Sequence, residues 1–357
     1  MGLRYPAERI LIRSPNWIGD AIAATAAVRC IRRNYPGAHI AMLLEPYVRP
    51  VFENAPWFDE MVPFHKERGR IRAVMAATRT LRRQARYDMA MLMTHSFSSA
   101  LVVRLIGAKV RVGHSREGRS WLLTDAVRWP AAGSDQRLVP KVTIYRSLLE
   151  YLGCERASDQ RPEVFTSEEE EAHVGQLLHG RYDPEEHPLL AIVPGAAYGA
   201  SKLWKPERFA EVSDVLAERH NVQPMILTGP NEGVIGREIA SRMNATPITF
   251  EDGSLTFGHV KALIRRAGLM ICNDTGPRHL AIAYEVPVVV IMGPTDPAVT
   301  DSDYRKTLIL RQEVPCGPCY QRECPRDHRC MELITTDMVV EAAEDLIERF
   351  GFQKTGD

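Results

Sequence analysis

Three turns in the second half of the sequence combine glycine with polar residues in a way that suits a bound diphosphate. They are "VPGAAYGASKLWK" with Gly195 and Lys202, "LTGPNEG" with Thr228, Gly229 and Glu232, and "NDTGPRH" with Asp274, Thr275, Gly276 and His279. Small residues let backbone N–H groups approach an anion, and a lysine adds a full positive charge. A carboxylate at a strand end, such as that of Glu232, commonly holds ribose hydroxyls. Together the turns indicate a site for a nucleoside diphosphate.

The third turn has three interpretations from its residues alone. Asp274, Thr275 and Gly276 suit an acid/base catalytic turn, a phosphate cradle at a helix N-terminus, or an ordinary strand-to-helix corner. His279 falls inside the helix that follows, where it either packs against a backbone group or contacts a ligand. Both roles stay open at this point.

The first half has one distinctive turn, "RSPNWIGDAIAATAAV", in which Gly19 and Asp20 follow the first apolar run. Aspartate is a good helix N-cap, and the spacing alone favours that role for Asp20. The alternative is a carboxylate that faces a cleft and acts as a general base.

Four cysteines are clustered in "CGPCYQRECPRDHRC" as Cys316, Cys319, Cys324 and Cys330, with His328 among them. Four thiols at this spacing could bind Zn²⁺ or an iron–sulfur cluster, form redox-sensitive disulfides, or stay free. The spacing differs from that of a two-knuckle zinc site, whose cysteine pairs lie further apart. A metal bound here would cross-link a long loop that precedes the last helix.

A basic segment covers residues 66–86. Its cations are Lys66, Arg68, Arg70, Arg72, Arg79, Arg82, Arg83 and Arg86, against the single acid Glu67. Apolar residues recur at helical spacing through Ile71, Val74, Met75, Thr78 and Leu81, which predicts one apolar face and a basic remainder. The basic face is either simply solvated or contacts an anionic partner.

These residues are placed by alternating apolar runs and amphipathic segments. Strands are predicted at 9–13, 39–45, 61–64, 87–93, 110–114, 188–195, 223–229, 269–274, 286–294 and 306–311, with helices between them. Continuously apolar strands separated by helices indicate parallel sheets buried on both faces. The polar stretch around residue 160 predicts a linker between two doubly wound α/β domains, 1–160 and 161–357. Ligands of such sheets bind at the carboxyl ends of the strands, where every turn named above falls.

Bulk composition excludes several classes of protein. The chain has 357 residues with 45 Lys and Arg against 45 Asp and Glu, so no overall field draws it to nucleic acid. The N-terminus has no secretory signal, and the longest apolar runs fall far short of the ~20 residues of a membrane span. These features predict a cytoplasmic protein.

"SPNWIGDAIAATAAV", "PGAAYGASKLWKPERFAEV" and "NDTGPRHLAIAYEVPVVVIMGPTDP" together resemble the ADP-heptose:lipopolysaccharide heptosyltransferases, glycosyltransferase family 9. The resemblance runs over nearly the whole chain. It implies a GT-B fold, with two Rossmann-like domains facing each other across a cleft. The N-terminal domain would bind the acceptor and the C-terminal domain the ADP-sugar, and the final helix is free to pack back on the N-terminal domain.

The resemblance also implies roles for single residues. Asp20 matches the catalytic base of the family, which overturns the preference for a cap, and Lys202 matches its diphosphate-contacting lysine. Donor binding falls to Gly195, Thr228, Glu232, Asp274, Thr275, Gly276 and His279. The third turn then becomes a phosphate and sugar cradle, in which Asp274 orients heptose hydroxyls or shapes the turn.

The implied reaction transfers L-glycero-D-manno-heptose from ADP-heptose to heptosyl-Kdo-lipid A, with inversion and without a required cofactor. Arg70, Arg72 and Arg79 would contact the anionic acceptor, at the cytoplasmic face of the inner membrane. A structural zinc or a disulfide at the cysteine cluster remains an option. The alternatives are a family member with a different acceptor, and a non-catalytic nucleotide- or metal-binding sensor.

Overall fold

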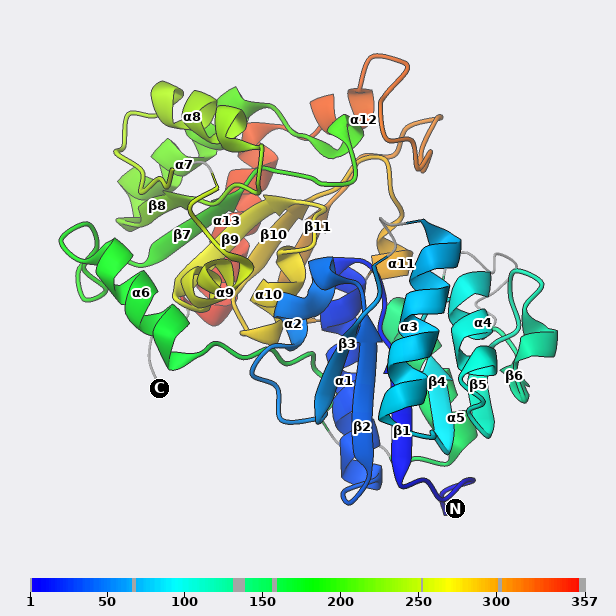
Figure 1. The fold of residues 1–357 in the computed structure, drawn as a ribbon. Helices are drawn as coiled ribbons and strands as arrows, with labels where there is room; N and C mark the ends of the chain where they lie inside the picture. The colour runs from blue at the N-terminus through cyan, green and yellow to red at the C-terminus, as the bar shows by residue number, and fades with distance from the viewer. Residues whose placement is uncertain are drawn as a thin grey trace. The chain divides into compact units, whose positions relative to one another are not determined.

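A computed structural model describes residues 2–65, 69–130, 139–155, 159–251, 253–300 and 304–352. The chain divides into two compact units (Figure 1). Unit 1 comprises Met1–Phe165 and Ala298–Ser302, and unit 2 comprises Thr166–Pro297 and Asp303–Asp357. The change of unit thus falls between Phe165 and Thr166, whereas the sequence placed the domain boundary at residues 160 and 161.

Unit 1 is built on a parallel sheet with the strand order β3-β2-β1-β4-β5-β6. Its strands are β1 (Arg9–Arg13), β2 (His39–Leu44), β3 (Glu60–Pro63), β4 (Met89–Leu92), β5 (Val110–His114) and β6 (Asp125–Val127). In the register, Ile10 pairs with both Ile40 and Met89, and all three side chains are fully buried. The edge strand β6 was not predicted, because three residues are too few to show a pattern.

The helices of unit 1 lie on both faces of its sheet (Figure 1). They are α1 (Ile18–Asn34), η1 (Pro46–Val48), α2 (Arg49–Phe52), α3 (Arg70–Gln84), α4 (Phe97–Leu105), η3 (Ser120–Leu122) and α5 (Lys141–Leu152). Helix α1 packs against α5, and α3 packs against α4. This arrangement explains why the middle of β1, residues 10–12, and all of β4 are apolar and buried.

Helix α3 contradicts part of the prediction for the basic segment. Its buried stripe is Ala73, Val74, Ala77, Thr78 and Leu81. Ile71 and Met75, expected on the apolar face, are 81% and 46% exposed, because the stripe that meets the sheet and α4 is centred one position further round the helix. Arg70, Arg72 and Arg79 are exposed, as expected, while Lys66 and Arg68 lie outside the described residues.

Unit 2 is built on a second parallel sheet with the strand order β11-β10-β9-β7-β8. Its strands are β7 (Leu189–Val193), β8 (Gln223–Ile226), β9 (Ala267–Asn273), β10 (Val288–Ile291) and β11 (Thr307–Leu310). Every residue of β7, β9 and β10 is buried, which their unbroken apolar sequences predicted. Parallel sheets covered on both faces confirm the predicted α/β class in both units.

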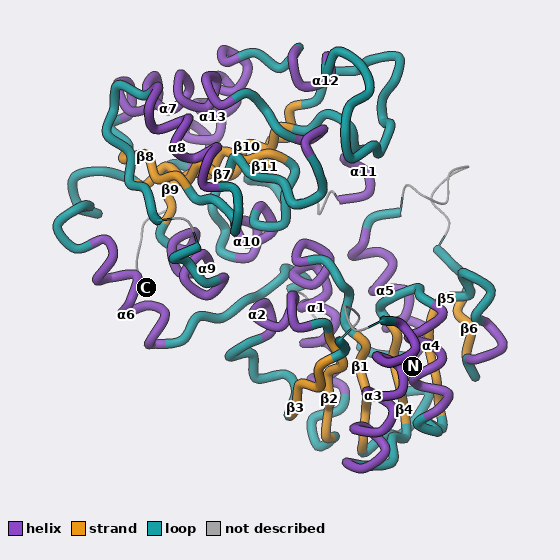
Figure 2. The backbone as a smooth tube through the Cα atoms, turned by 45° about the horizontal axis from the view of Figure 1, so that its top comes forward, coloured by secondary structure: helices purple, strands orange, loops and turns teal. Residues whose placement is uncertain are grey.

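Helices cover the second sheet on both faces as well (Figure 2). They are α6 (Glu168–Leu178), η4 (Ala200–Lys202), α7 (Pro206–His220), α8 (Gly233–Arg242), α9 (Phe257–Arg265), α10 (Arg278–Ala283), α12 (Arg329–Glu332) and α13 (Thr336–Phe350). The short α11 (Pro297–Thr300) begins where the chain leaves unit 2. The final helix α13 packs on α7 and on β9, β10 and β11, so its packing, which the sequence left open, is within unit 2.

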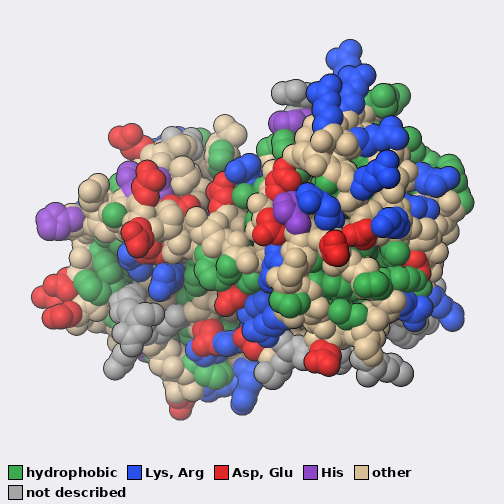
Figure 3. Space-filling model, turned by 60° about the horizontal axis from the view of Figure 1, so that its bottom comes forward, with side chains coloured by type: hydrophobic (Ala, Val, Ile, Leu, Met, Phe, Trp, Pro, Cys, Tyr) green, Lys and Arg blue, Asp and Glu red, His purple; other side chains and the backbone are tan. Residues whose placement is uncertain are grey.

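Charges of both signs are interspersed on the face drawn in Figure 3, in keeping with the balanced composition. Among the described helices, none has the length and apolar character needed to cross a membrane.

Candidate functional site

The turn after β9 joins the neighbouring turn of the unit 2 sheet through a buried asparagine. Asn273 Nδ2 donates to the carbonyl oxygen of Pro194 at 2.6 Å, and Asn273 Oδ1 accepts from the backbone N–H of Trp204 at 3.2 Å. Both bonds are shielded from water, because Asn273 is fully buried. They fix the two ends of the segment that carries Gly195 and Lys202.

Asp274 is the centre of the site in unit 2. Its carboxylate accepts hydrogen bonds from Lys202 Nζ, from Arg278 Nη1 at 3.2 Å and from Thr295 Oγ1 at 2.7 Å. Lys202 Nζ also donates to the Asp274 carbonyl oxygen at 3.2 Å. The side chains of Asp274 and Lys202 are only 6% and 11% exposed. The arrangement gives Asp274 a turn-shaping role and aims Lys202 at the carboxyl edge of the sheet.

The charges around Asp274 control its ionisation. Burial by itself disfavours the carboxylate, but the nearby Arg278 and Lys202 cations and the hydrogen bonds from Lys202 and Thr295 hold its pKa at about 2. Asp274 is therefore ionised at neutral pH, and it offsets one of the two buried positive charges beside it.

We expect this depressed pKa to appear in the acid stability of the protein. The folded-state pKa of about 2 lies below the unfolded value of 3.8, so the stabilisation is complete above about pH 4 and is lost as pH falls towards 2. Its size is about 2 kcal/mol at neutral pH. In Asp274→Asn this part of the pH dependence should be missing from unfolding free energies measured in urea at pH 5 and pH 2.5. The matched control is Asp345→Asn, which breaks an exposed pair with Arg349. Equal pH dependence in the two variants would contradict the prediction.

Glu232 lies against the turn that follows β7. Its Oε2 accepts a hydrogen bond from the backbone N–H of Gly229 at 2.8 Å. A Cβ atom on Gly195 would lie 1.8 Å from the same oxygen, so only glycine leaves room for this carboxylate at position 195. The structure therefore brings together Gly195, Gly229 and Glu232 from the first two turns.

The other residues predicted for donor binding lie at the same sheet edge. Thr228 follows β8 and is half-buried, while Thr275 and Gly276 form the turn between β9 and α10. His279 is the second residue of α10, and its burial together with the Arg278 cation lowers its pKa to about 3. His279 is therefore neutral at physiological pH.

Asp20 is not the N-cap of α1. The helix begins at Ile18 with Trp17 as its N-cap, so Asp20 is the third helical residue. The interpretation of Asp20 as a cap is therefore wrong, although a carboxylate in the first turn still suits the helix dipole. Asp20 Oδ2 lies 3.3 Å from Lys141 Nζ, and both side chains are partly exposed at 24% and 29%.

Sequence reasoning missed a second group of residues in unit 1. His95 follows β4 and His114 is the last residue of β5, and both rings pack edge-on against Trp129, with centroids 4.8 and 5.1 Å away. The Arg116 guanidinium lies over the same indole at 4.4 Å. Burial, and then the Arg119 cation, lowers the pKa of His95 to about 3 and that of His114 to about 4. The sequence signal that could have identified these two histidines was their position at the carboxyl ends of strands.

All seven cysteines are free thiols in the structure. Cys316, Cys319 and Cys324 are half-buried and Cys330 is buried. Within the described residues, no three His, Cys, Asp or Glu side chains are grouped as a metal site. The structural metal or disulfide stays a prediction.

Comparison with known proteins connects this geometry to a family. The family model described as glycosyltransferase family 9 (heptosyltransferase) matches residues 74–329. The chain is also 26% identical over 317 residues to lipopolysaccharide heptosyltransferase 2 of Salmonella typhimurium, an alignment that covers 85% of this chain and 88% of that protein.

Two solved structures have the same fold. A glycosyl transferase family 9 protein from Veillonella parvula aligns with a TM-score of 0.82 at 23% identity, covering 98% of this chain and 99% of its own. ADP-heptose LPS heptosyltransferase II of E. coli aligns with a TM-score of 0.76 at 25% identity, covering 96% and 99%. The predicted GT-B class, with two Rossmann-like domains, is confirmed by these likenesses.

Proposed function

Because the chain belongs to glycosyltransferase family 9, we propose that it is an inverting heptosyltransferase of the heptosyltransferase II type. It moves L-glycero-D-manno-heptose from ADP-heptose to the heptosyl-Kdo-lipid A inner core of lipopolysaccharide. Its similarity to lipopolysaccharide heptosyltransferase 2 and to ADP-heptose LPS heptosyltransferase II supports this donor and this class of acceptor. The observation that carries the proposal is the buried Lys202–Asp274 pair at the carboxyl edge of the unit 2 sheet.

Unit 2 is the donor-binding part in this proposal. Lys202, held in place by Asp274, supplies positive charge to the diphosphate, and this charge stabilises ADP as it leaves. Arg278 remains as a charged partner of Asp274 when Lys202 turns to the phosphates. Glu232 accepts hydrogen bonds from the ribose hydroxyls, while Thr228, Thr275, Gly276 and His279 line the same edge. The ADP moiety therefore needs no metal ion in this mechanism.

Asp20 is the general base. It accepts the proton of the acceptor hydroxyl as that oxygen attacks the anomeric carbon, which inverts the configuration there. Asp20 lies before the segment that matches the family model, so its role rests on the turn motif and on its place after β1. The Lys141 ammonium lies 3.3 Å from its carboxylate.

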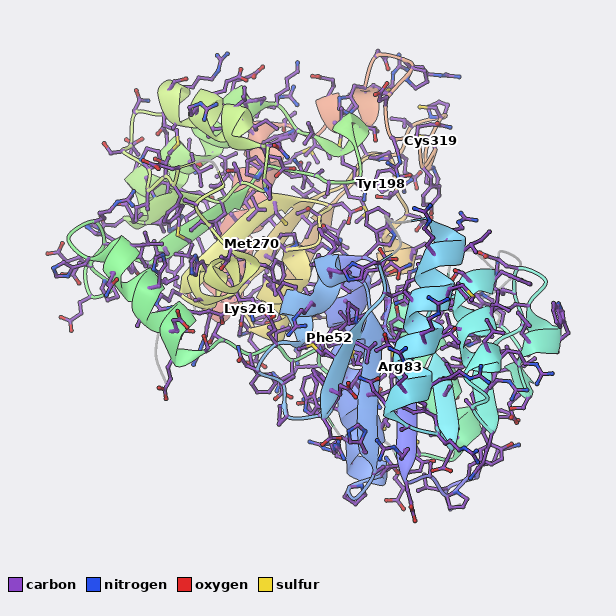
Figure 4. All side chains as sticks on the ribbon, in the orientation of Figure 1. Phe52, Arg83, Tyr198, Lys261, Met270 and Cys319 are labelled. Carbon is purple, nitrogen blue, oxygen red and sulfur yellow. The ribbon has the colours of Figure 1, made fainter. Side chains whose placement is uncertain are left out.

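An anionic acceptor suits the charges of unit 1. Arg116, Arg119 and Lys141 all act on His95 as nearby cations. The exposed Arg72 and Arg79 share one face of α3 with Arg83, and the exposed Arg70 begins the helix (Figure 4). We assign these arginines to the acceptor phosphates, at the cytoplasmic face of the inner membrane, where the acceptor is held by its lipid.

The test is ADP release from ADP-heptose by the purified protein, with Kdo-lipid A acceptors that carry either no heptose or one. Turnover only with the mono-heptosylated acceptor is the expected result. Turnover only with the bare Kdo acceptor would keep the transferase and its site but reassign the acceptor. Absence of turnover with both acceptors would contradict the proposed function.

A further inference from the structure

We propose that residues 315–330, the cysteine loop, position Lys202 for the donor diphosphate, with His328 as a positioning residue. The proposal rests on the function proposed above for Lys202. The transfer reaction assigns no role to the cysteine-rich segment. The proposal connects this segment to the donor site.

The cysteine loop forms hydrogen bonds with every polar group of Ser201, the residue next to Lys202. The Ser201 backbone N–H donates to the Arg322 carbonyl at 3.0 Å, and the hydroxyl donates to the Gln321 carbonyl at 2.6 Å. The carbonyl oxygen of Ser201 accepts from His328 Nε2 at 2.7 Å. Ser201 is 2% exposed, so water does not compete for these bonds. The backbone at Lys202 is therefore fixed by a segment about 120 residues further along the chain.

The cysteine loop also contacts Tyr198 and Gly199, which precede Lys202 in the turn after β7. The Tyr198 hydroxyl donates to the Tyr320 carbonyl at 2.5 Å, and the Lys202 ammonium lies 4.9 Å from the centre of the Tyr198 ring. A Cβ atom on Gly199 would lie 2.3 Å from the Arg322 carbonyl oxygen. Figure 4 labels Tyr198 and Cys319, one from each of the two segments joined in this way.

The opposite side of the cysteine loop contacts the turn after β10. The Tyr320 backbone N–H donates to the Pro294 carbonyl at 3.0 Å, and a Cβ atom on Gly293 would lie 2.8 Å from Cys330 Sγ. The next residue, Thr295, donates to Asp274. The loop thus supports both partners of the buried pair, Lys202 through Ser201 and Asp274 through Thr295.

The thiols make this coupling measurable. Cys316 lines a pocket of about 250 Å³ together with Pro315, Arg326, Asp327 and Arg329, so a small reagent can reach the loop. Burial, and then the thiols of Cys319, Cys324 and Cys316, raises the pKa of Cys330. If donor binding and loop order are coupled, each must affect the other by the same factor.

The first experiment replaces His328 in the full-length protein. His328→Ala should raise both the KM for ADP-heptose and the ADP dissociation constant about tenfold, the upper range for one lost hydrogen bond, with kcat within about twofold. His328→Gln should restore most of the affinity, because its amide nitrogen can donate to the Ser201 carbonyl. The matched control is His187→Ala, since the His187 ring also bonds a backbone carbonyl in unit 2, that of Asn221 at 3.1 Å. Unchanged donor affinity in His328→Ala would overturn the proposal.

The second experiment needs no substitution. Wild-type protein is alkylated with iodoacetamide with and without ADP, and modification of Cys316, Cys319 and Cys324 is followed by peptide mass spectrometry. We expect ADP to slow alkylation several-fold, and His328→Ala to lose this protection. Equal alkylation rates with bound ADP would overturn the coupling while ADP release by the same protein still upheld the proposed function. A wild-type protein that neither binds ADP nor releases it would instead refute the function.

Discussion

Asp20→Asn is expected to lower kcat for heptosyl transfer about 10²–10⁴-fold, the usual contribution of a positioned general base. Asparagine keeps the size and polarity of the side chain in the first turn of α1 but cannot accept a proton at neutral pH. The dissociation constant of ADP should stay unchanged, because Asp20 belongs to unit 1 and the nucleotide residues belong to unit 2. Steady-state ADP release and isothermal titration calorimetry measure the two quantities.

The control for this variant is Asp88→Asn. Asp88 also pairs with a lysine in unit 1, Lys109 at 2.8 Å, but it precedes β4 and so stands at the amino end of the sheet. Its kcat should match that of the wild type. Wild-type turnover by Asp20→Asn would show that Asp20 is not the general base. Another residue of unit 1 would then have to accept the proton.

Lys202→Met is the second change with a large expected effect, a fall in kcat/KM for ADP-heptose of about 10²–10³-fold. Methionine keeps the unbranched stem that packs near Tyr198 but removes the charge that meets the diphosphate. The site should remain folded, because Asp274 keeps Arg278 and Thr295 as partners. ADP affinity should fall together with kcat/KM, since the lysine contacts the leaving group before and during transfer.

Lys205→Met provides the matched control for Lys202. Lys205 is three residues along, its side chain is 46% exposed, and it pairs with Glu332 at 2.8 Å. Loss of this surface pair should leave kcat/KM close to the wild-type value. A similar loss in both variants would mean that general positive charge, and not the buried Lys202, serves the donor.

The fold was largely predictable, because each sheet is buried on both faces. Strands such as β7 and β10 have no polar residue, and helix α7 lies in the interval between two predicted strands. The exceptions are local. Helix α1 begins two residues before Asp20, and Ile71 turns outward although its spacing fits an apolar face. The spacing of apolar residues in a sequence predicts the period of a buried stripe, but it does not show which neighbouring element covers that stripe.

The site was predictable as a set of turns but not as a set of contacts. Residue types pointed to the glycine Gly195, the lysine Lys202 and the carboxylate Glu232, yet nothing in the sequence showed that the Glu232 carboxylate contacts Gly195. Thr295 lies within the third quoted motif without a role assigned to it, and its bond to Asp274 joins two turns 21 residues apart. Composition left metal binding, disulfides and free thiols open for the cysteine loop, whereas its contact with Ser201 depends on tertiary structure.

Trp204 has a consequence for spectroscopy. It is the only tryptophan in the sequence of unit 2, while the other four belong to unit 1. Trp204 lies two residues after Lys202 and is 2% exposed. Its indole Nε1 donates to the Ile334 carbonyl at 2.9 Å, and its backbone N–H donates to Asn273 Oδ1. A protein whose other tryptophans are replaced by phenylalanine would therefore carry one fluorophore, buried in the donor half and joined to the turn that holds Asp274. Its emission would report nucleotide arrival without any added dye.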